Sequence, residues 1–561
     1  MACLWFLSAG TLPTVRAATI VWANVGTTFS TGSNWVGSVA PANSIVTDIG
    51  SFQAVSVTAN PNLTASRSIN GLEFTSGTAG WTFTGSGGTR ILTLGTGGIV
   101  SNASTTQTFN NAGLGIALGA ATTFTSNSTG ALSFGSSLAS FVNGGFLLTL
   151  SGTSTNANNL IAEAISGTGG LTKTGSGTWT LSGANTYSGT TNIGTTGGAD
   201  GGTLVLGANH VLPGTTVSIF GGTLDINTRT DTIGALNLGG GAAGTTANIT
   251  GTTGTLTLGG NLTYNATNNA DGATISGNLN LGGAGRTFTV NDSSAAATDL
   301  TISGNVSAAN RNLIVTGAGN TLISGNIATG TGGLTKQGTG TLTLSGTNTY
   351  TGVTTFAAGT VSVSTIGNGG VAGNLGHAAN PANRLVFSGG TLQYTGATAS
   401  TNRSFTLTGG SSGTINVTNA AQSSGASTTT HLSGAPHPQR PQSPHRRHQC
   451  RYGRGRLRRH AGLWCEQRVG DRYSQCLRRH PGHQHPHRHH RRAQSGRRRH
   501  RRPTSPAPPA PSRSAAISPI TPPTTPMAPR SPATSTSAVP TGLSRSTTAR
   551  PPPPISPSAA T

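Results

Sequence analysis

The acidic and histidine side chains are the residues of this sequence that could do chemistry. An enzyme that cleaves glycans needs two carboxylates close together, one as a proton donor and one as a base or nucleophile. Asp225 and Asp231 come closest to such a pair, and we interpret both as turn residues. His210 and His377 stand without any partner motif. The other acids before residue 431 are scattered singly, at Asp48, Glu73, Glu163, Asp200, Asp271, Asp292 and Asp299.

The glycine-rich loops lack the spacing of a phosphate-binding or metal-binding site. No Gly-Lys-Ser/Thr follows any of them, and no strand leads into a helix of the dinucleotide-binding type. Residues 197–200 (GGAD) are similar to one unit of a calcium-binding nonapeptide, but the unit does not repeat. We therefore predict no catalytic, cofactor-binding or metal-binding residues, no cofactor and no enzyme.

The net charge of +23 is distributed so unevenly that it divides the chain in two. Residues 1–430 carry 10 basic and 9 acidic side chains, whereas residues 431–561 carry 24 basic and 2 acidic ones. A basic chain is typical of a nucleic-acid-binding protein, but here the charge belongs to the tail alone. The nearly neutral first part is rich in Thr and Val, which favour strands, and in Gly and Asn, which favour turns.

Two near-copies of one segment indicate how the neutral part folds. Residues 167–191 read GTGGLTKTGSGTWTLSGANTYSGTT, and residues 330–355 read GTGGLTKQGTGTLTLSGTNTYTGVTT. In GTLTLSG (residues 340–346), alternation with period two places Leu342 and Leu344 on one face of a strand. Flanking glycines are expected to supply a positive φ or a bulge at each corner. Shorter echoes recur at residues 202–207, 222–226, 254–259 and 390–394.

Short strands without helices leave a sandwich, a barrel or a parallel β-helix as the fold. The repeat favours the β-helix, because one short strand is unstable alone and stacking in register lets each turn cover the next. Asn185 matches Asn348, and Tyr187 matches Tyr350, just after the repeated strand. We interpret these four as structural corner residues and not as ligands.

The pattern GGLTKxGxGTLTLSGxNTYTGxTT resembles the passenger-associated transport repeat, a β-strand repeat of bacterial autotransporter passengers. The match is best at residues 169–191 and 332–355, and the segment from Trp22 through Trp35 to Pro41 resembles the opening that often precedes such repeats. The resemblance implies a secreted or surface-displayed right-handed parallel β-helix whose turn-by-turn folding assists export. It implies no catalytic residues. The translocator that usually follows such passengers is not visible in the sequence.

We divide the sequence into four segments. Residues 1–18 are expected to be a truncated signal peptide, because an apolar run precedes small residues, although a buried first strand is the alternative. Residues 19–160 are predicted to begin the solenoid. Residues 160–430 are predicted to be a β-helix with repeats at about 167–207 and 330–365. No run of about 20 apolar residues is present, so we expect no transmembrane segment.

Residues 431–561 form a disordered, low-complexity tail in our prediction, rich in Arg, His and Pro. Taken at face value, residues 485–492 (HPHRHHRR) suggest a metal-binding or nucleic-acid-binding arm. Cys450, Cys465 and Cys476 suggest zinc, but their spacing fits no Cys-x-x-Cys pattern.

A frameshift explains more of this tail. Residues 269–283, written in GC-ending codons and read one base later, translate to TPMAPRSPATSTSA, which is residues 525–538. Read in the opposite frame, residues 477–481 and 487–490 are compatible with Ser-Gly-Gly-Thr-Leu and Thr-Gly-Thr-Thr. We therefore predict that residues from 431 onward are further repeats translated out of frame, with a second shift near residue 503. Resequencing of the gene would test this prediction.

The sequence as a whole predicts a non-enzymatic β-solenoid passenger, a structural stalk or adhesin-like scaffold whose repeats assist export. Its expected location is extracellular or on the bacterial cell surface, associated with the outer membrane. Glycans or other cell surfaces are the predicted partners of its Thr/Ser/Asn faces, together with outer-membrane export machinery, and nucleic acid is not. The alternative is an extracellular polysaccharide-active β-helix enzyme, which a cluster of carboxylates on one face would favour.

Overall fold

A computed structural model describes residues 17–199, 201–268, 271–418 and 428–433. All of them belong to the first of two compact units, residues 1–469. The second unit, residues 470–561, lies outside the described residues, as do the predicted signal peptide up to residue 16 and nearly all of the predicted out-of-frame tail.

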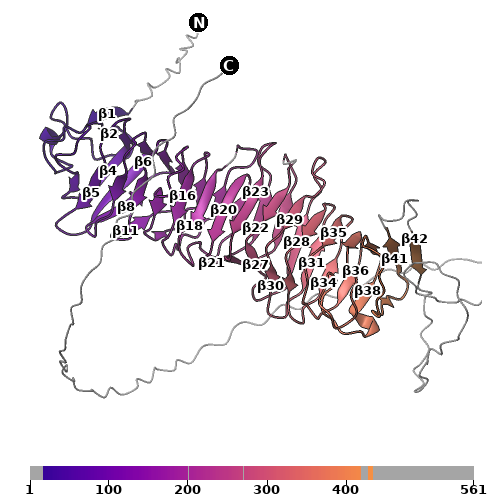
Figure 1. Cartoon of the computed structure of the whole chain (residues 1–561). Helices are drawn as coiled ribbons and strands as arrows, with labels where there is room; N and C mark the ends of the chain where they lie inside the picture. The colour runs from indigo at the N-terminus through magenta and orange to yellow at the C-terminus, as the bar shows by residue number, and fades with distance from the viewer. Residues whose placement is uncertain (1–16, 200, 269–270, 419–427, 434–561) are drawn as a thin grey trace, which may run out of the picture. The chain divides into compact units, whose positions relative to one another are not determined.

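The described residues form a parallel β-solenoid, in which the chain returns to the same sheet once in every turn (Figure 1). Leu171 pairs with Thr191, and Thr191 pairs with Val217, so one turn takes 20 residues and the next takes 26. The strands of successive turns pair in parallel, and the antiparallel pairing of β41 with β42 stands apart from this stack. Within the described ranges there is no α-helix, which confirms the predicted all-β parallel β-helix.

The strands fall into three sheets that run along the stack of turns. The first sheet holds β1(Ala18–Val21), β2(Asp48–Phe52), β4(Arg67–Phe74), β6(Arg90–Ser101), β8(Leu114–Leu118), β9(Thr122–Ser126), β11(Ser140–Val142), β12(Leu148–Ser151), β14(Ile165–Ser166), β15(Leu171–Lys173), β17(Thr191–Ile193), β19(Val217–Ile219), β22(Leu236–Gly239), β25(Leu262–Asn265), β28(Arg286–Val290), β31(Leu313–Thr316), β34(Leu334–Lys336), β36(Thr354–Phe356), β38(Leu385–Phe387) and β40(Thr406–Leu407).

The second sheet follows the first in each turn. It holds β3(Asn62–Leu63), β5(Thr82–Gly85), β7(Gln107–Phe109), β10(Leu132–Phe134), β13(Leu160–Ile161), β16(Thr178–Leu181), β18(Thr203–Leu206), β20(Gly222–Asn227), β23(Ala247–Gly251), β26(Ala273–Ile275), β29(Leu300–Ile302), β32(Thr321–Ile323), β35(Thr341–Leu344), β37(Thr360–Val363), β39(Thr391–Tyr394), β41(Ser412–Val417) and β42(Thr428–Ser433). The third sheet holds β21(Thr230–Ile233), β24(Thr255–Leu258), β27(Asn278–Asn280), β30(Val306–Ser307) and β33(Ile327–Ala328).

The core is a set of apolar ladders, because equivalent inward positions repeat from turn to turn. On the second sheet one ladder is formed in register by fully buried Leu204, Leu224, Ile249, Ile275, Ile302, Ile323 and Leu344. Nearer the N-terminus the rings of Phe83, Phe109 and Phe134 stack with centroids 4.6 and 4.8 Å apart. These distances match the spacing of hydrogen-bonded strands, about 4.8 Å. Alternation in the GTLTLSG segment is thus confirmed, since Leu342 and Leu344 are both fully buried.

Aromatic side chains cluster in the first turns of the solenoid, where Trp22, Phe29 and Trp35 are all buried. Trp22 and Trp35 meet edge to face with ring centroids 5.0 Å apart, and Phe29 meets Trp35 in the same manner at 5.1 Å. The short 3₁₀ helix η1(Gly32–Asn34) sets the approach of Trp35, whose indole N–H donates to the carbonyl of Phe29 at 2.8 Å. A second 3₁₀ helix, η2(Ala382–Arg384), precedes β38. The cluster shields the apolar end of the first turns from water.

Two reasons, and not one, explain the glycines of the repeat corners. Gly338 has φ +68°, the left-handed region that was expected at a corner. Gly340 has no such φ, but a Cβ there would lie 2.1 Å from the carbonyl oxygen of Gly319 in the previous turn. The expectation of a positive φ or a bulge therefore omits one reason, because close approach of neighbouring turns also selects glycine.

Candidate functional site

The repeated asparagines bind the backbone of the turns before and after their own. Asn348 is fully buried, and its Oδ1 accepts from the amide of Ile327 at 2.8 Å while its Nδ2 donates to the carbonyl of Asn374 at 2.7 Å. Asn185 does the same with Ile165 and Val211, each at 2.8 Å. Each side chain therefore connects three turns, which is a structural role, as the sequence indicated.

The repeated tyrosines are also buried, and each finds one hydroxyl partner. The phenol oxygen of Tyr187 lies 2.6 Å from Thr191 Oγ1, and that of Tyr350 lies 2.8 Å from Thr354 Oγ1. Burial raises the pKa of Tyr350 to about 12 and raises that of Tyr187 as well, so both phenols stay neutral at physiological pH. Neither hydroxyl reaches the surface to bind a ligand.

The two lysines of the chain occupy inward positions of the first sheet, and backbone carbonyls surround their ammonium groups. Lys173 Nζ donates to the carbonyls of Thr174 and Gly175 at 2.8 Å, and to that of Gly201 in the next turn at 2.9 Å. Lys336 Nζ donates to the carbonyls of Gln337 and Gly338. Desolvation lowers the pKa of Lys336 to about 8. Through these hydrogen bonds the two lysines stabilise the corner between the first and second sheets.

The lowered pKa of Lys336 predicts that stability rises with pH. Below pH 8 the folded and unfolded chains both carry the charge, so the folded chain bears its desolvation cost in full. Between pH 8 and the usual lysine pKa of about 10.4, the unfolded state binds more protons, and the free energy of unfolding is expected to rise by about 1–3 kcal/mol. Urea unfolding at pH 7.5 and 9.0, about one unit below the ordinary tyrosine pKa, would measure the Lys336 contribution as the difference between wild type and variant. Lys336→Met should flatten the rise, and an unchanged slope would contradict the prediction.

The two acids that lie nearest each other in the sequence, Asp225 and Asp231, both accept hydrogen bonds from backbone amides. Asp231 is buried, and its carboxylate accepts from the amides of Val211, Leu212 and Thr232 at 2.7–2.9 Å. Burial raises the pKa of Asp231, while these hydrogen bonds oppose the shift. Asp225 instead accepts from the amide of Asn227 in its own turn at 2.8 Å. Both aspartates thus act as backbone acceptors, one buried and one at a turn.

The histidines lie apart from each other in the fold. His210 and His377 are exposed on separate loops. Asp200, the acid of residues 197–200, lies outside the described residues. In the part of the chain that is described, no three His, Cys, Asp or Glu side chains gather as metal ligands would. The same residues include no helix of the length and apolarity that crossing a membrane requires.

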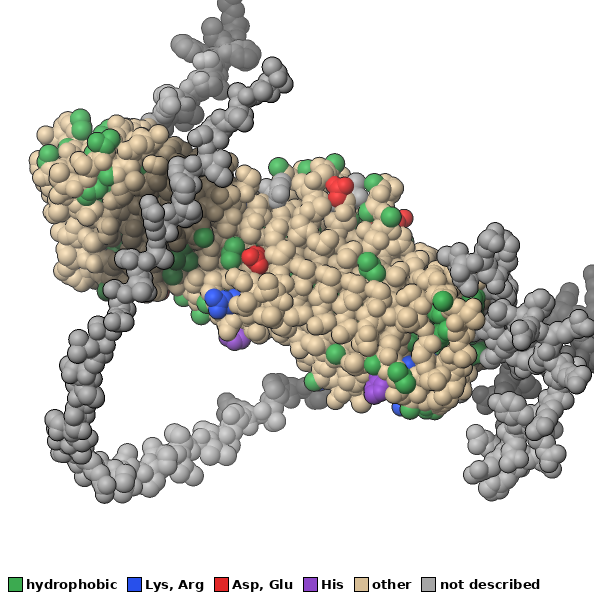
Figure 2. Space-filling model, viewed as in Figure 1, with side chains coloured by type: hydrophobic (Ala, Val, Ile, Leu, Met, Phe, Trp, Pro, Cys, Tyr) green, Lys and Arg blue, Asp and Glu red, His purple; other side chains and the backbone are tan. Residues whose placement is uncertain are grey.

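The outward face of the first sheet carries an uncharged ladder, which we call the polar column. One outward residue per turn contributes to it over nine successive turns, and strand pairing keeps these residues in register. They are Thr123, Thr149, Thr172, Asn192, Ser218, Asn237, Thr263, Thr289 and Thr316. Thr172 and Ser218 are buried, and the other seven are half-buried. Asn237 Nδ2 donates to Ser218 Oγ at 3.3 Å along the column. Figure 2 shows how few charged side chains interrupt the visible face of the described residues.

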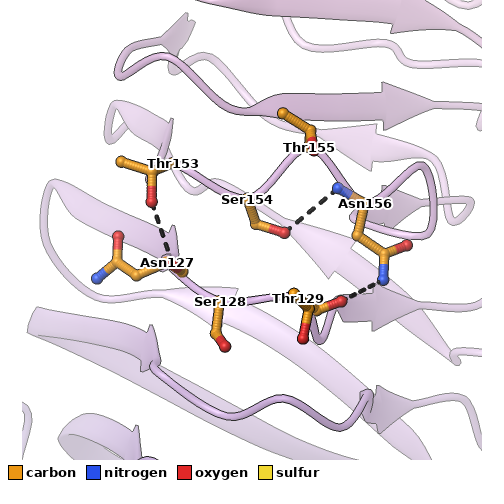
Figure 3. Close-up of a pocket in the computed structure, with 7 residues that line it drawn as sticks. All are labelled: Asn127, Ser128, Thr129, Thr153, Ser154, Thr155 and Asn156. Atoms are coloured by element: carbon orange, nitrogen blue, oxygen red, sulfur yellow. Dashed lines mark hydrogen bonds between the residues drawn. The ribbon is translucent and has the colours of Figure 1, made fainter. Parts of the chain in front are cut away.

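A shallow pocket of about 510 Å³ opens beside this column, at the corner between the first and second sheets. The loop before β10 supplies one wall, and the longer loop before β13 supplies the other (Figure 3). Its lining consists of hydroxyl and amide side chains, namely Asn127, Ser128, Thr129, Thr153, Ser154, Thr155 and Asn156. Sequence reasoning did not single out these residues. The signal that could have found them is the run of Ser, Thr and Asn in each of two successive loops between strands.

The stacked turns and their buried corner residues define a β-solenoid repeat protein. A family model of the passenger-associated-transport-repeat matches residues 171–198 and 334–363, inside the two repeats found in the sequence. The chain is also 38% identical over 308 residues to the adhesin BmaC autotransporter of Brucella suis biovar 1 (strain 1330), and this match covers 45% of the chain. The chain spans only 8% of that adhesin. No solved structure matches the chain significantly.

Proposed function

We propose that the chain is a non-enzymatic, adhesin-like scaffold of a bacterial autotransporter. The repeat match and the similarity to an autotransporter adhesin support an extracellular or cell-surface location, associated with the outer membrane. Export of the chain through outer-membrane machinery, with its repeats assisting, belongs to this proposal. The stacked turns extend a surface outward, and that surface makes the adhesive contacts.

The single observation that carries the proposal is the polar column on the first sheet. Over nine successive turns this position holds Thr, Ser or Asn without a charge, and seven of these side chains are partly exposed. Such a face offers regularly spaced hydrogen-bond donors and acceptors. A single one of these contacts binds a partner weakly, and only many contacts together give useful affinity. Glycans and other cell surfaces, which present many hydroxyls, are the partners that suit it.

A cell-binding assay tests this function. We expect purified chain to bind cell monolayers saturably, and Thr149→Glu with Thr263→Glu on the polar column to reduce binding at least fivefold. The matched control is Thr223→Glu with Thr301→Glu, which places the same two charges on half-buried outward positions of the second sheet. Equal loss from both double variants, or no binding by the wild type, would refute the polar column as the adhesive face.

The enzymatic alternative makes a different prediction. A polysaccharide-active enzyme should release reducing ends from neutral or acidic polysaccharides, and Asp225→Asn or Asp231→Asn should abolish that release. We expect no release, because the carboxylates of Asp225 and Asp231 accept hydrogen bonds from backbone amides and thereby hold the backbone in place. Reducing-end assays on the full chain would measure it.

A further inference from the structure

We propose that the pocket lined by residues 127–129 and 153–156 binds a neutral saccharide unit. This inference rests on the proposed surface function and names the ligand class of one site within it. The pocket exists because one corner is longer than its neighbours. Strand pairing of Ser133 with Leu160 spans 27 residues, whereas that of Leu160 with Thr180 spans 20. The extra residues stand out beside the preceding loop and form the hollow.

The walls of the pocket are held in place by side chains at their base. Asn159 is fully buried, and its Oδ1 accepts from the amide of Leu132 while its Nδ2 donates to the carbonyl of Thr178 at 3.2 Å. Buried Ser154 donates to the carbonyl of Gly130 at 3.2 Å. The pocket is therefore formed before any ligand arrives, which lowers the entropic cost of binding.

Two further hydrogen bonds join the loops across the pocket (Figure 3). Asn156 Nδ2 donates to the carbonyl of Thr129 at 2.7 Å, and Thr153 Oγ1 donates to the carbonyl of Asn127 at 3.1 Å. These bonds use backbone carbonyls of the first loop. Within the described part of the chain, the hydroxyls of Ser128, Thr129 and Thr155 then remain available for a ligand.

The lining determines the chemistry of the ligand. It contains hydroxyls, amides and threonine methyl groups, with no charged or aromatic side chain. An anion would find no cation there, and a cation would find no carboxylate. A neutral sugar can exchange hydrogen bonds with Ser128, Thr129 and Thr155 while its C–H groups lie against the methyl groups. A volume of about 510 Å³ falls in the range of small-ligand sites.

The open form of the pocket predicts weak binding, in the millimolar range. Weak sites suit a scaffold displayed in many copies, because linked contacts raise avidity without any new interaction. Since no charge takes part, binding is expected to be insensitive to salt.

Saturation-transfer NMR on the full chain tests the pocket. Glucose, galactose and N-acetylglucosamine are the neutral probes, glucuronic acid is the charged probe, and cyclohexanol is the apolar one. We expect at least one neutral sugar to bind at millimolar concentration, equally at 50 and 500 mM NaCl, and the other two classes not to bind. Binding of glucuronic acid or cyclohexanol alone would overturn the assignment.

Variants locate the binding. Thr129→Val with Thr155→Val removes two hydroxyls at nearly constant volume and should weaken sugar binding at least tenfold. Thr347→Val, at an exposed threonine of another turn, is the matched control and should change nothing. If the double variant loses its circular dichroism spectrum, Ser128→Ala carries the same test. Unchanged binding in folded variants would refute the pocket.

The two proposals fail separately. If the chain adheres to cells but binds no neutral sugar, the saccharide pocket is wrong and the adhesive surface stands. If sugar binds at the pocket but cells are not bound, the surface function is wrong instead.

Discussion

Gly340→Ala is expected to destabilise the solenoid by about 3 kcal/mol or more. The new Cβ would lie 2.1 Å from the carbonyl oxygen of Gly319 and 2.7 Å from that of Ala318. Both atoms belong to the backbone of the previous turn, so no side chain can rotate away to make room. The two turns must separate instead, which weakens the ladder between β32 and β35. Urea unfolding followed by circular dichroism measures the loss.

Gly367→Ala is the matched control for this substitution. Gly367 lies one turn further on, has no positive φ, and would place a Cβ with no heavy atom within 4 Å. We expect its unfolding midpoint to stay within error of the wild type or to rise slightly, since alanine restricts the unfolded chain. Equal destabilisation by the two substitutions would show that close approach does not explain Gly340.

Asn348→Ala is expected to cost about 2–4 kcal/mol, because it removes the partners of two buried backbone groups at once. The amide of Ile327 and the carbonyl of Asn374 lie in the turns before and after, so all three turns should loosen together. Hydrogen exchange followed by mass spectrometry should show faster exchange across residues 323–328 and 370–376, in addition to a lower unfolding midpoint.

The control for Asn348 is another asparagine that bridges turns. Asn326 Oδ1 accepts from the amide of Thr347 at 2.9 Å, but at an exposed position where water can replace it. Asn326→Ala should therefore cost less than about 1 kcal/mol. If both alanine variants lose the same stability, burial of the asparagine is not what makes Asn348 important.

Much of the fold was predictable from the sequence because each turn of a solenoid repeats the same short strand pattern and packs mainly on its two neighbouring turns. The alternation of Leu342 and Leu344 with threonine fixes which face of a strand is inward, and recurrence of that pattern implies stacking. Matched spacing of Asn185 with Asn348 likewise indicated corner residues. The predicted absence of catalytic residues stays a prediction, as do the frameshift and the signal peptide.

The sequence could not predict which atoms the repeated residues contact. Lys173 and Lys336 occupy matched positions in the two sequence repeats. The sequence does not show, however, that backbone carbonyls of the corner surround their ammonium groups. The pocket was hidden for a related reason. Its walls lie 26 residues apart in sequence, at Asn127 and Thr153, and become neighbours only through the register of β9 with β12.

The sequence by itself determined the periodic part of this protein: short strands, an apolar interior, glycine corners and a neutral, hydroxyl-rich surface. These follow from composition and alternation, which act within one turn. The tertiary structure alone decided how many residues each turn takes, and therefore which loops protrude and which side chains meet across turns. The turn that begins at Leu171 takes 20 residues, for example, and the turn that begins at Thr191 takes 26. Stacking brings loops of unequal length next to each other, and this forms the pocket beside the polar column. The sequence alone does not show this, because the neighbouring surface residues are one full turn apart in the chain.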